Sequence, residues 1–305
     1  AATSYSNHGV PMVPFYIFYS MFGFQRIGDL AWAAGDSQAR GFLIGATSGR
    51  TTLNGEGLQH QDGHSHLLAS TIPNCVSYDP TYAYELAVII QDGLRRMYTE
   101  RENRFYYITT MNENYPQPAM PEGVTEGIVR GMYRLHASDG APRVRLGGAG
   151  SILREVEAAA EMLKNDFDVS VEVWSLTSIN ELVRDGQRAR RWNLLNPDQE
   201  ARVPYFTAQL EGSDAPFVVA TDYMKSLAEP LRAFCPAPFH TLGTDGYGRS
   251  DTRAQLREFF EVGRRWVAYA ALASLVEIGE LGTADLVAAR DKLGIDPGKD
   301  DPTTV

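Results

Sequence analysis

The densest group of chemically active side chains lies in residues 51–66, which read TTLNGEGLQHQDGHSH. This stretch holds half of the six histidines of the chain. Its histidines, carboxylates and glycines are His60, His64, His66, Glu56, Asp62, Gly55, Gly57 and Gly63. Histidine changes charge near neutral pH, and glycine lets the backbone turn tightly. Such a loop is therefore suited to proton transfer.

Two other interpretations of this loop are open from the residues alone. Histidines and carboxylates also bind metals, although no H-E-x-x-H pair and no neighbouring cysteine supports a zinc site here. A polar surface loop whose histidines face water would have the same composition. The segments on either side of the loop favour the proton-transfer interpretation.

The composition limits the classes of partner. The 305 residues are 44% hydrophobic and 22% charged, which is typical of a globular protein, and the length allows two domains. A net charge of −10 argues against nucleic acid and against an anionic membrane surface as partners. The sequence contains no apolar run of about 18 residues, the length that a membrane-spanning helix requires. Cys75 and Cys235 lie outside any C-x-x-C motif, which indicates a reducing compartment, the cytoplasm.

The order of predicted elements indicates an α/β fold with mainly parallel sheets. In the first part, apolar strands are predicted at residues 12–19, 41–46, 74–78 and 105–109, the first of them buried. Helices are predicted between them, at residues 22–35 and around residues 86–97, where apolar residues recur at helical spacing. The histidine-rich loop follows the second strand, where α/β proteins usually place their chemistry.

The connection between the two predicted domains begins in the proline-rich residues 112–123. Glu113 and Tyr115 in this segment are either rim residues of a site or parts of a linker turn. A helix at residues 125–135 is assigned to the first domain. The polar turn that follows places the boundary at residue 138, which gives domains 1–138 and 139–305.

The second domain is predicted to repeat the alternation of strands and helices. Strands are expected at residues 143–146, 169–173, 217–220 and 240–242. Ser178 and Glu181 form a capping box that opens a helix, which is expected to end at Gly186. The turn GGAGS at residues 147–151 fails the G-x-G-x-x-G nucleotide motif, because Leu153 stands where the third glycine belongs. A tight turn between strand and helix is the preferred interpretation.

Three further features allow both a functional and a structural interpretation. The aromatic residues within 19–24 flank a predicted strand-to-helix turn, where they form either a stacking wall for a flat heterocycle or ordinary core. Arg40 and Arg50 flank the predicted strand at residues 41–46, and either can hold an anionic substrate, although neither is a specific signal. Arg249 can do the same, but an internal ion pair with Asp245 or Asp251 is favoured.

Four long segments together closely resemble the homodimeric bacterial type of pyruvate dehydrogenase, the thiamine-diphosphate-dependent, decarboxylating component of the pyruvate dehydrogenase complex. They read YSMFGFQRIGDLAWAAGD, ARGFLIGATSGRTTLNGEGLQHQDGHSH, YYITTMNENYPQPAMPEG and GTDGYGRSD. The resemblance covers nearly all of the chain but only the C-terminal part of the family. It implies a pyrimidine-binding domain that is incomplete at its N-terminus, followed by a transketolase-type C-terminal domain.

The resemblance also implies roles for individual residues. Tyr19 and Phe22 match aromatic residues that line the cofactor's aminopyrimidine ring and the reaction centre, and Phe22 is expected to stack on the cofactor. His60 matches an active-site histidine that faces the cofactor, and Glu56 matches a carboxylate on a proton path.

His64 and His66 resemble the DGxTH loop of transketolases and complete the expected catalytic set. The glutamate that activates the cofactor and the segment that holds Mg²⁺ and the diphosphate have no counterpart in this chain. Taken alone, the chain is therefore expected to be incomplete and inactive. The Mg²⁺ ligands are expected in a missing N-terminal part.

The family's partners are the remaining expectations. They are pyruvate, the lipoyl domain and acyltransferase core of the complex, and a second copy of the chain in a homodimer. One alternative is ketol transfer on sugar phosphates by an enzyme like transketolase or deoxyxylulose phosphate synthase. The other is a fragment without activity that serves assembly or dimerisation. Pyruvate and a slightly longer 2-keto acid are not distinguished by the sequence.

Overall fold

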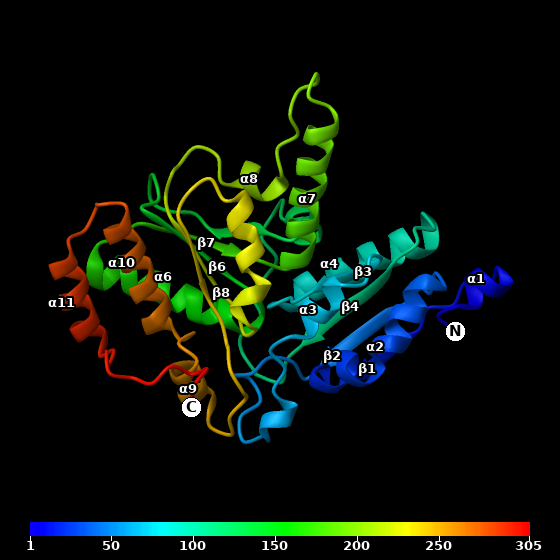
Figure 1. Ribbon diagram of the computed structural model, residues 1–305, viewed down its shortest axis with the longest axis horizontal. Coiled ribbons are helices and arrows are strands. Elements are labelled where there is room, and N and C mark those ends of the chain that lie inside the picture. The colour runs from blue at the N-terminus through cyan, green and yellow to red at the C-terminus, as the bar shows by residue number, and fades with distance from the viewer.

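The computed structural model describes residues 1–305, which form two adjacent α/β units (Figure 1). In the first unit, four parallel strands form a sheet in the order β1-β2-β4-β3. These strands are β1 (Phe15–Phe18), β2 (Phe42–Ala46), β3 (Cys75–Tyr78) and β4 (Phe105–Thr110). The helices of this unit are α1 (Ser4–His8), α2 (Ser20–Asp36), α3 (Ser65–Ser70), α4 (Ala83–Leu94) and α5 (Thr125–Arg130).

The second unit contains a five-stranded sheet in the order β5-β7-β6-β8-β9, parallel except for the edge strand β5. Its strands are β5 (Tyr133–His136), β6 (Val144–Gly148), β7 (Val171–Ser175), β8 (Phe217–Ala220) and β9 (Phe239–Leu242). Its helices are α6 (Leu153–Phe167), α7 (Ile179–Leu195), α8 (Tyr205–Gln209), α9 (Arg253–Phe259), α10 (Arg264–Glu277) and α11 (Thr283–Leu293). The predicted α/β class with parallel sheets is therefore confirmed.

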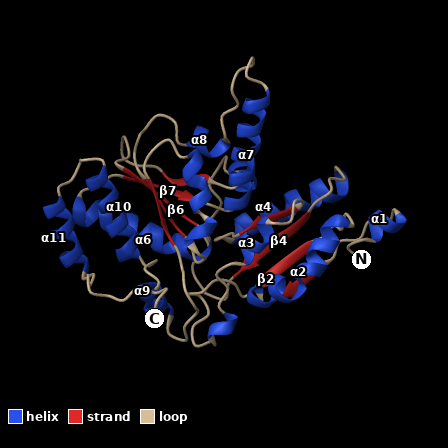
Figure 2. Ribbon diagram, in the orientation of Figure 1, coloured by secondary structure: helices blue, strands red, loops and turns tan.

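Helices cover both faces of the second sheet (Figure 2), and the sequence of β8 shows why this is required. Val218 and Ala220 face the core that contains α6 and α10, whereas Phe217 and Val219 face the core on the other side, next to α7 and α8. Successive side chains of a strand point to opposite faces, so a strand that is apolar at every position needs apolar cover on both.

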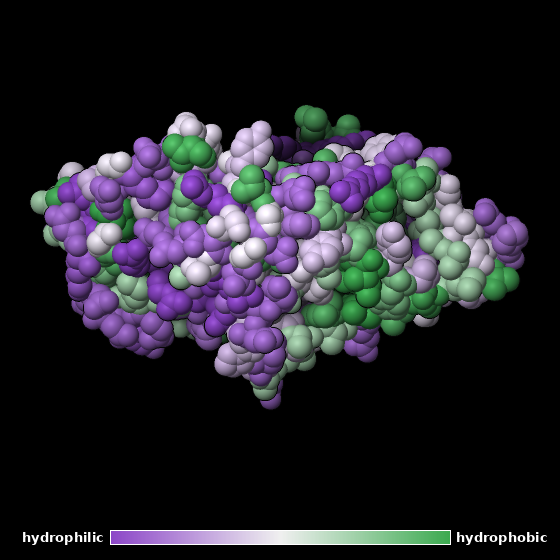
Figure 3. Space-filling model, turned by 90° about the horizontal axis from the view of Figure 1, so that it is seen from below, coloured by the Kyte–Doolittle hydropathy of each residue, from purple (hydrophilic) through white to green (hydrophobic).

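The first predicted strand is exposed, not buried. Phe15, Tyr16 and Ile17 are 49%, 55% and 67% exposed because β1 lies at the edge of the sheet and little packs over its faces. Figure 3 shows hydrophobic residues gathered over the first unit in the view from below. Apolar composition alone does not reveal whether anything packs on a strand, and the prediction of burial was wrong for this reason.

The predicted helix at residues 125–135 is also wrong in its C-terminal half. Helix α5 ends at Arg130 because Gly131 adopts a left-handed φ of 109°, and β5 then pairs with β7 of the second sheet. The second sheet therefore begins before the expected boundary at residue 138. Conversely, α7 does not end at Gly186: this glycine packs against the ring of Phe234, and the helix continues to Leu195. No helix combines the length and the apolar content that crossing a membrane requires.

Candidate active site

Three aromatic rings meet at the carboxyl edge of the first sheet. Tyr19 follows β1 directly, Phe22 lies in the first turn of α2, and His60 lies in a short 3₁₀ helix in the loop after β2. The ring centroids are 5.9 Å apart for Tyr19 and Phe22, 5.6 Å for Tyr19 and His60, and 5.1 Å for Phe22 and His60. Because β1 and β2 are parallel neighbours, the segments that follow them emerge side by side.

Glu56 lies beside the imidazole of this cluster. Its Oε2 is 3.5 Å from Nδ1 of His60, an ion-pair distance, and this buried Nδ1 has no hydrogen-bond partner in the chain. A carboxylate near one ring nitrogen favours the tautomer that is protonated there, which leaves the other nitrogen free to accept a proton. The guanidinium of Arg26 lies 4.1 Å from the centroid of the Phe22 ring.

A cavity of about 580 Å³ adjoins the residues next to the three rings. It is lined by Met21, Gln25, Arg50, His64, Gln61, residues 57–59 and residues 246–248. Nε2 of His64 contacts Nε2 of Gln25, so these side chains share one wall. Tyr247 is 85% exposed at the rim. The cavity therefore lies between the histidine-rich loop of the first unit and the Gly-rich loop of the second.

His66 is not brought into this cavity. It is only 3% exposed, its Nε2 lies 3.0 Å from Oγ1 of Thr109, and its ring packs against Tyr107 and Tyr223. Burial lowers the pKa of His66 to about 4, and the nearby charge of Asp62 only partly opposes this effect. Tyr19, Phe22, His60 and Glu56 converge on one another, and His64 lines the adjoining cavity. His66 is instead part of the packing between the two units.

Two buried carboxyl groups between the units were missed by sequence reasoning. Oδ1 of Asp79 accepts a hydrogen bond from Oγ1 of Thr109 at 2.6 Å, and burial raises the pKa of Asp79 to about 7. Asp222 accepts from the backbone N–H of Thr51 at 3.0 Å, and burial likewise raises its pKa to about 7. No local sequence signal marks either residue as buried.

His66 and Asp79 are expected to give stability opposite dependences on pH. The folded state binds the His66 proton less tightly than the unfolded chain, so stability is lost as the pH falls from about 6.5 to about 4. It binds the Asp79 proton more tightly, so stability is lost as the pH rises from about 4 to about 7. Each effect is at most about 3–4 kcal/mol, at 1.4 kcal/mol per pKa unit.

Urea unfolding of His66→Gln and Asp79→Asn between about pH 4 and 8 measures these contributions. Because the two pH windows overlap, each variant is compared with the unaltered protein at the same pH. The stability of His66→Gln relative to the unaltered protein should rise as the pH falls from about 6.5 to about 4, and that of Asp79→Asn should rise as the pH rises from about 4 to about 7. The exposed His136 provides the control variant His136→Gln. Changes of the same sign in both test variants would contradict the assignment.

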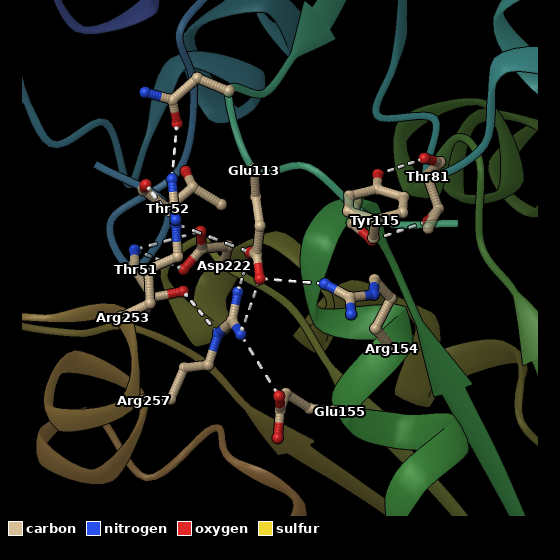
Figure 4. Close-up of polar contacts among 12 residues, drawn as sticks. Thr51, Thr52, Thr81, Glu113, Tyr115, Arg154, Glu155, Asp222, Arg253 and Arg257 are labelled. Carbon is tan, nitrogen blue, oxygen red and sulfur yellow. Dashed lines mark hydrogen bonds and ion pairs between the residues drawn. The ribbon is translucent and has the colours of Figure 1, made fainter. Parts of the chain in front are cut away.

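A network of ion pairs fixes the histidine-rich loop and the proline-rich connection against the second unit (Figure 4). Nη2 of Arg257 donates to Glu113, and its Nη1 lies 3.3 Å from Oε1 of Glu155. Glu113 also accepts from Nη1 of Arg154 at 2.9 Å, while Arg253 donates to the carbonyl of Thr52 at 2.9 Å. Between the two interpretations of Glu113, the structure favours the structural one.

Two further expectations from the sequence concern Tyr115 and Arg249. The hydroxyl of Tyr115 donates to the carbonyl of Thr81, so this residue also belongs to the connection between the units. The expected ion pair of Arg249 with Asp245 or Asp251 is wrong. The guanidinium of Arg249 packs over the ring of Phe259 at 4.2 Å, where no carboxylate is needed.

Comparison with solved structures identifies the class of fold. A transketolase from Campylobacter jejuni matches with a TM-score of 0.63 at 17% identity, over 89% of this chain and 37% of that chain. A split-gene transketolase, described as an inactive β4 tetramer, matches with a TM-score of 0.64 at 18% identity, over 90% of this chain and 80% of that chain. Residues 131–263 also match the family model of the transketolase-like C-terminal domain. The fold is therefore transketolase-like.

Comparisons with family models and related sequences identify a family within this class of fold. Residues 1–118 match the family model of the pyruvate dehydrogenase E1 component middle domain. Over 99% of its length, the chain is 60% identical to the pyruvate dehydrogenase E1 component of Pseudomonas aeruginosa and 59% identical to that of Escherichia coli. It belongs to the pyruvate dehydrogenase E1 family, which confirms the resemblance seen in the sequence. The chain covers 35% and 34% of these two relatives, about a third of their length.

Proposed function

We propose that these residues form part of a thiamine-diphosphate-dependent active site that decarboxylates pyruvate. The observation that carries the proposal is the convergence of Tyr19, Phe22 and His60 at the carboxyl edge of the first sheet. Membership of the pyruvate dehydrogenase E1 family supports the choice of reaction. The 59–60% identity to these relatives favours it over ketol transfer on sugar phosphates, because the matched transketolases are only 17–18% identical.

The residues present fit a flat cofactor ring with adjacent proton chemistry. Tyr19 and Phe22 offer aromatic surface for a heterocycle, and the imidazole of His60 lies against both rings with Glu56 beside its Nδ1. Bound thiamine diphosphate would act as the electron sink of the decarboxylation. Glu56 would orient the imidazole, and His60 would donate and accept protons at the substrate.

The proposal extends to the rest of the family's function. We place the reductive acetylation of a lipoyl group, for acetyl-CoA synthesis, in a cytoplasmic homodimer bound to the acyltransferase core of the complex. No three His, Cys, Asp or Glu side chains within residues 1–305 are grouped as a metal site requires. Following the resemblance to the family, we propose that the ligands of Mg²⁺ lie outside these residues. The exposed apolar edge strand β1 is consistent with further chain packing there.

Phe22→Ala in the full-length protein tests the cofactor site. Calorimetric titration with thiamine diphosphate and Mg²⁺ should show affinity weakened about 10-fold, because an aromatic contact is worth about 0.5–1.5 kcal/mol beyond its buried area. Trp32→Ala removes an exposed aromatic residue from the same helix and should bind the cofactor normally.

Unchanged affinity of Phe22→Ala would remove Phe22 from the site. A parallel assay offers pyruvate or a ketose phosphate to the unaltered protein. Turnover of the ketose phosphate alone would overturn the proposed reaction. Absence of cofactor binding and of both activities would instead favour a role in assembly.

A further inference from the structure

Arg50 lies between the two units, and only one of its three guanidinium nitrogens makes hydrogen bonds within the chain. Its Nη1 donates to the carbonyl oxygens of Thr244 and Gly246 in the second unit. Its Nε is buried without a hydrogen-bond partner, and its Nη2 makes no hydrogen bond to the chain. The residue is only 5% exposed. A buried guanidinium that lacks partners is costly, which suggests that something else completes it.

The carboxylates around Arg50 do not pair with it. Asp62 accepts from the backbone N–H groups of His64 at 3.0 Å and Ser65 at 2.9 Å. Asp222 accepts from the N–H of Thr51, and Asp245 faces the ammonium of Lys225 at 3.7 Å. Burial lowers the pKa of Arg50, and the three carboxylates oppose this effect only in part. The positive charge therefore has no dedicated counter-ion in the chain.

The cavity that Arg50 lines suits a small organic anion. Its volume of about 580 Å³ and its side chains Met21 and Leu58 provide room and apolar surface for a short alkyl group. Gln25 and His64 add polar groups on the same wall. The guanidinium supplies a fixed charge of the kind that binds carboxylates with charge-assisted hydrogen bonds.

We propose that Arg50 binds the carboxylate of a small 2-keto acid in this cavity, with the alkyl group of the acid against Met21 and Leu58. Arg50 is then the residue that orients the substrate next to the Tyr19, Phe22 and His60 rings. The identity of the acid as pyruvate rests on the proposed function. The binding of a small carboxylate does not.

Binding of sodium pyruvate to the full-length, cofactor-free protein, measured by calorimetry, tests the inference. Arg50→Gln keeps a polar amide but removes the charge, and it should bind pyruvate at least about 10-fold more weakly. Arg50→Lys should lie between this variant and the unaltered protein. Arg249→Gln removes the same charge from the neighbouring loop and should bind pyruvate normally.

Met21→Trp provides a second test in case Arg50→Gln fails to fold. The larger side chain fills the cavity but leaves Arg50 and its contacts in place, so pyruvate binding should again be lost. Uncharged methyl pyruvate should not bind to any of the proteins. Equal affinity of Arg50→Gln and the unaltered protein for pyruvate would overturn the inference. Inorganic phosphate bound as tightly as pyruvate would overturn the assignment of a carboxylate.

A failure of the carboxylate site can be distinguished from a failure of the proposed function, because these titrations contain no thiamine diphosphate. If the cofactor does not bind but pyruvate binding depends on Arg50, the carboxylate site stands and the proposed function fails. If the cofactor binds and the enzyme turns over with an unaltered KM for pyruvate in Arg50→Gln, the carboxylate site fails alone.

Discussion

Replacing His60 by alanine in the full-length protein is expected to lower pyruvate-dependent acetyl transfer to lipoamide at least about 100-fold, the usual contribution of a positioned acid or base. The reason is geometric: the imidazole lies 5.1 Å and 5.6 Å, centroid to centroid, from the two aromatic rings, with a carboxylate 3.5 Å from Nδ1. Steady-state kinetics with purified acyl acceptor measures the loss. The effect should fall on kcat, because the residue serves proton transfer more than binding.

Replacement of an exposed histidine elsewhere in the chain is the control for the His60 test. His136 is exposed in the second unit, where its Nε2 lies 2.9 Å from Glu157, and His136→Ala should leave turnover unchanged. Glu56→Gln should produce a smaller loss than His60→Ala, since it removes only the group that orients the imidazole. Normal lipoamide-linked turnover in His60→Ala would exclude this residue from the chemistry.

Replacing Arg257 by methionine is expected to lower the free energy of unfolding by about 3 kcal/mol, as for other buried ion pairs that lose one partner. Methionine keeps most of the apolar stem but leaves Glu113 and Glu155, both mostly buried, with fewer positive partners. Arg154 and Arg264 remain to compensate in part, which keeps the expected loss at the lower end of the usual range. Urea denaturation followed by circular dichroism measures the change.

An ion pair on the surface provides the control for the Arg257 prediction. Arg290 forms an exposed pair with Asp291 at 2.9 Å, and Arg290→Met should change stability by less than about 0.5 kcal/mol. Because Arg257 joins the two units, its loss should also separate their unfolding transitions. Equal stability of the two variants would show that the network in Figure 4 contributes little.

Most of the secondary structure could be predicted from local patterns. The helical spacing of apolar residues in α2 and α4, and the short apolar runs of β2, β3, β4 and β8, identified these elements. The errors arose where distant residues decide the outcome. The exposure of β1 depends on the absence of a layer over it, and Gly186 lies inside α7 against the ring of Phe234 instead of ending the helix.

The candidate site, like the fold, could be predicted only in part from the sequence. The histidine-rich loop and the aromatic turn were recognisable, because their residue types and glycines stand together in the chain. Nothing local showed that β1 and β2 would be neighbours, and this pairing is what brings Phe22 to His60. The buried Asp79 and Asp222 carried no local signal, because their raised pKa values come from burial between the units.

The sequence by itself determined the fold class, most elements, the family and the residues able to carry protons, since these follow from composition, periodicity and motif. Only the tertiary structure decided which of those residues meet. It separated His66 from the cluster and placed Arg50 on the cavity wall without a counter-ion. The physical reason is that charge, pKa and contact depend on what surrounds a side chain. Those surroundings come from residues far away in the sequence, such as Glu113 and Arg257.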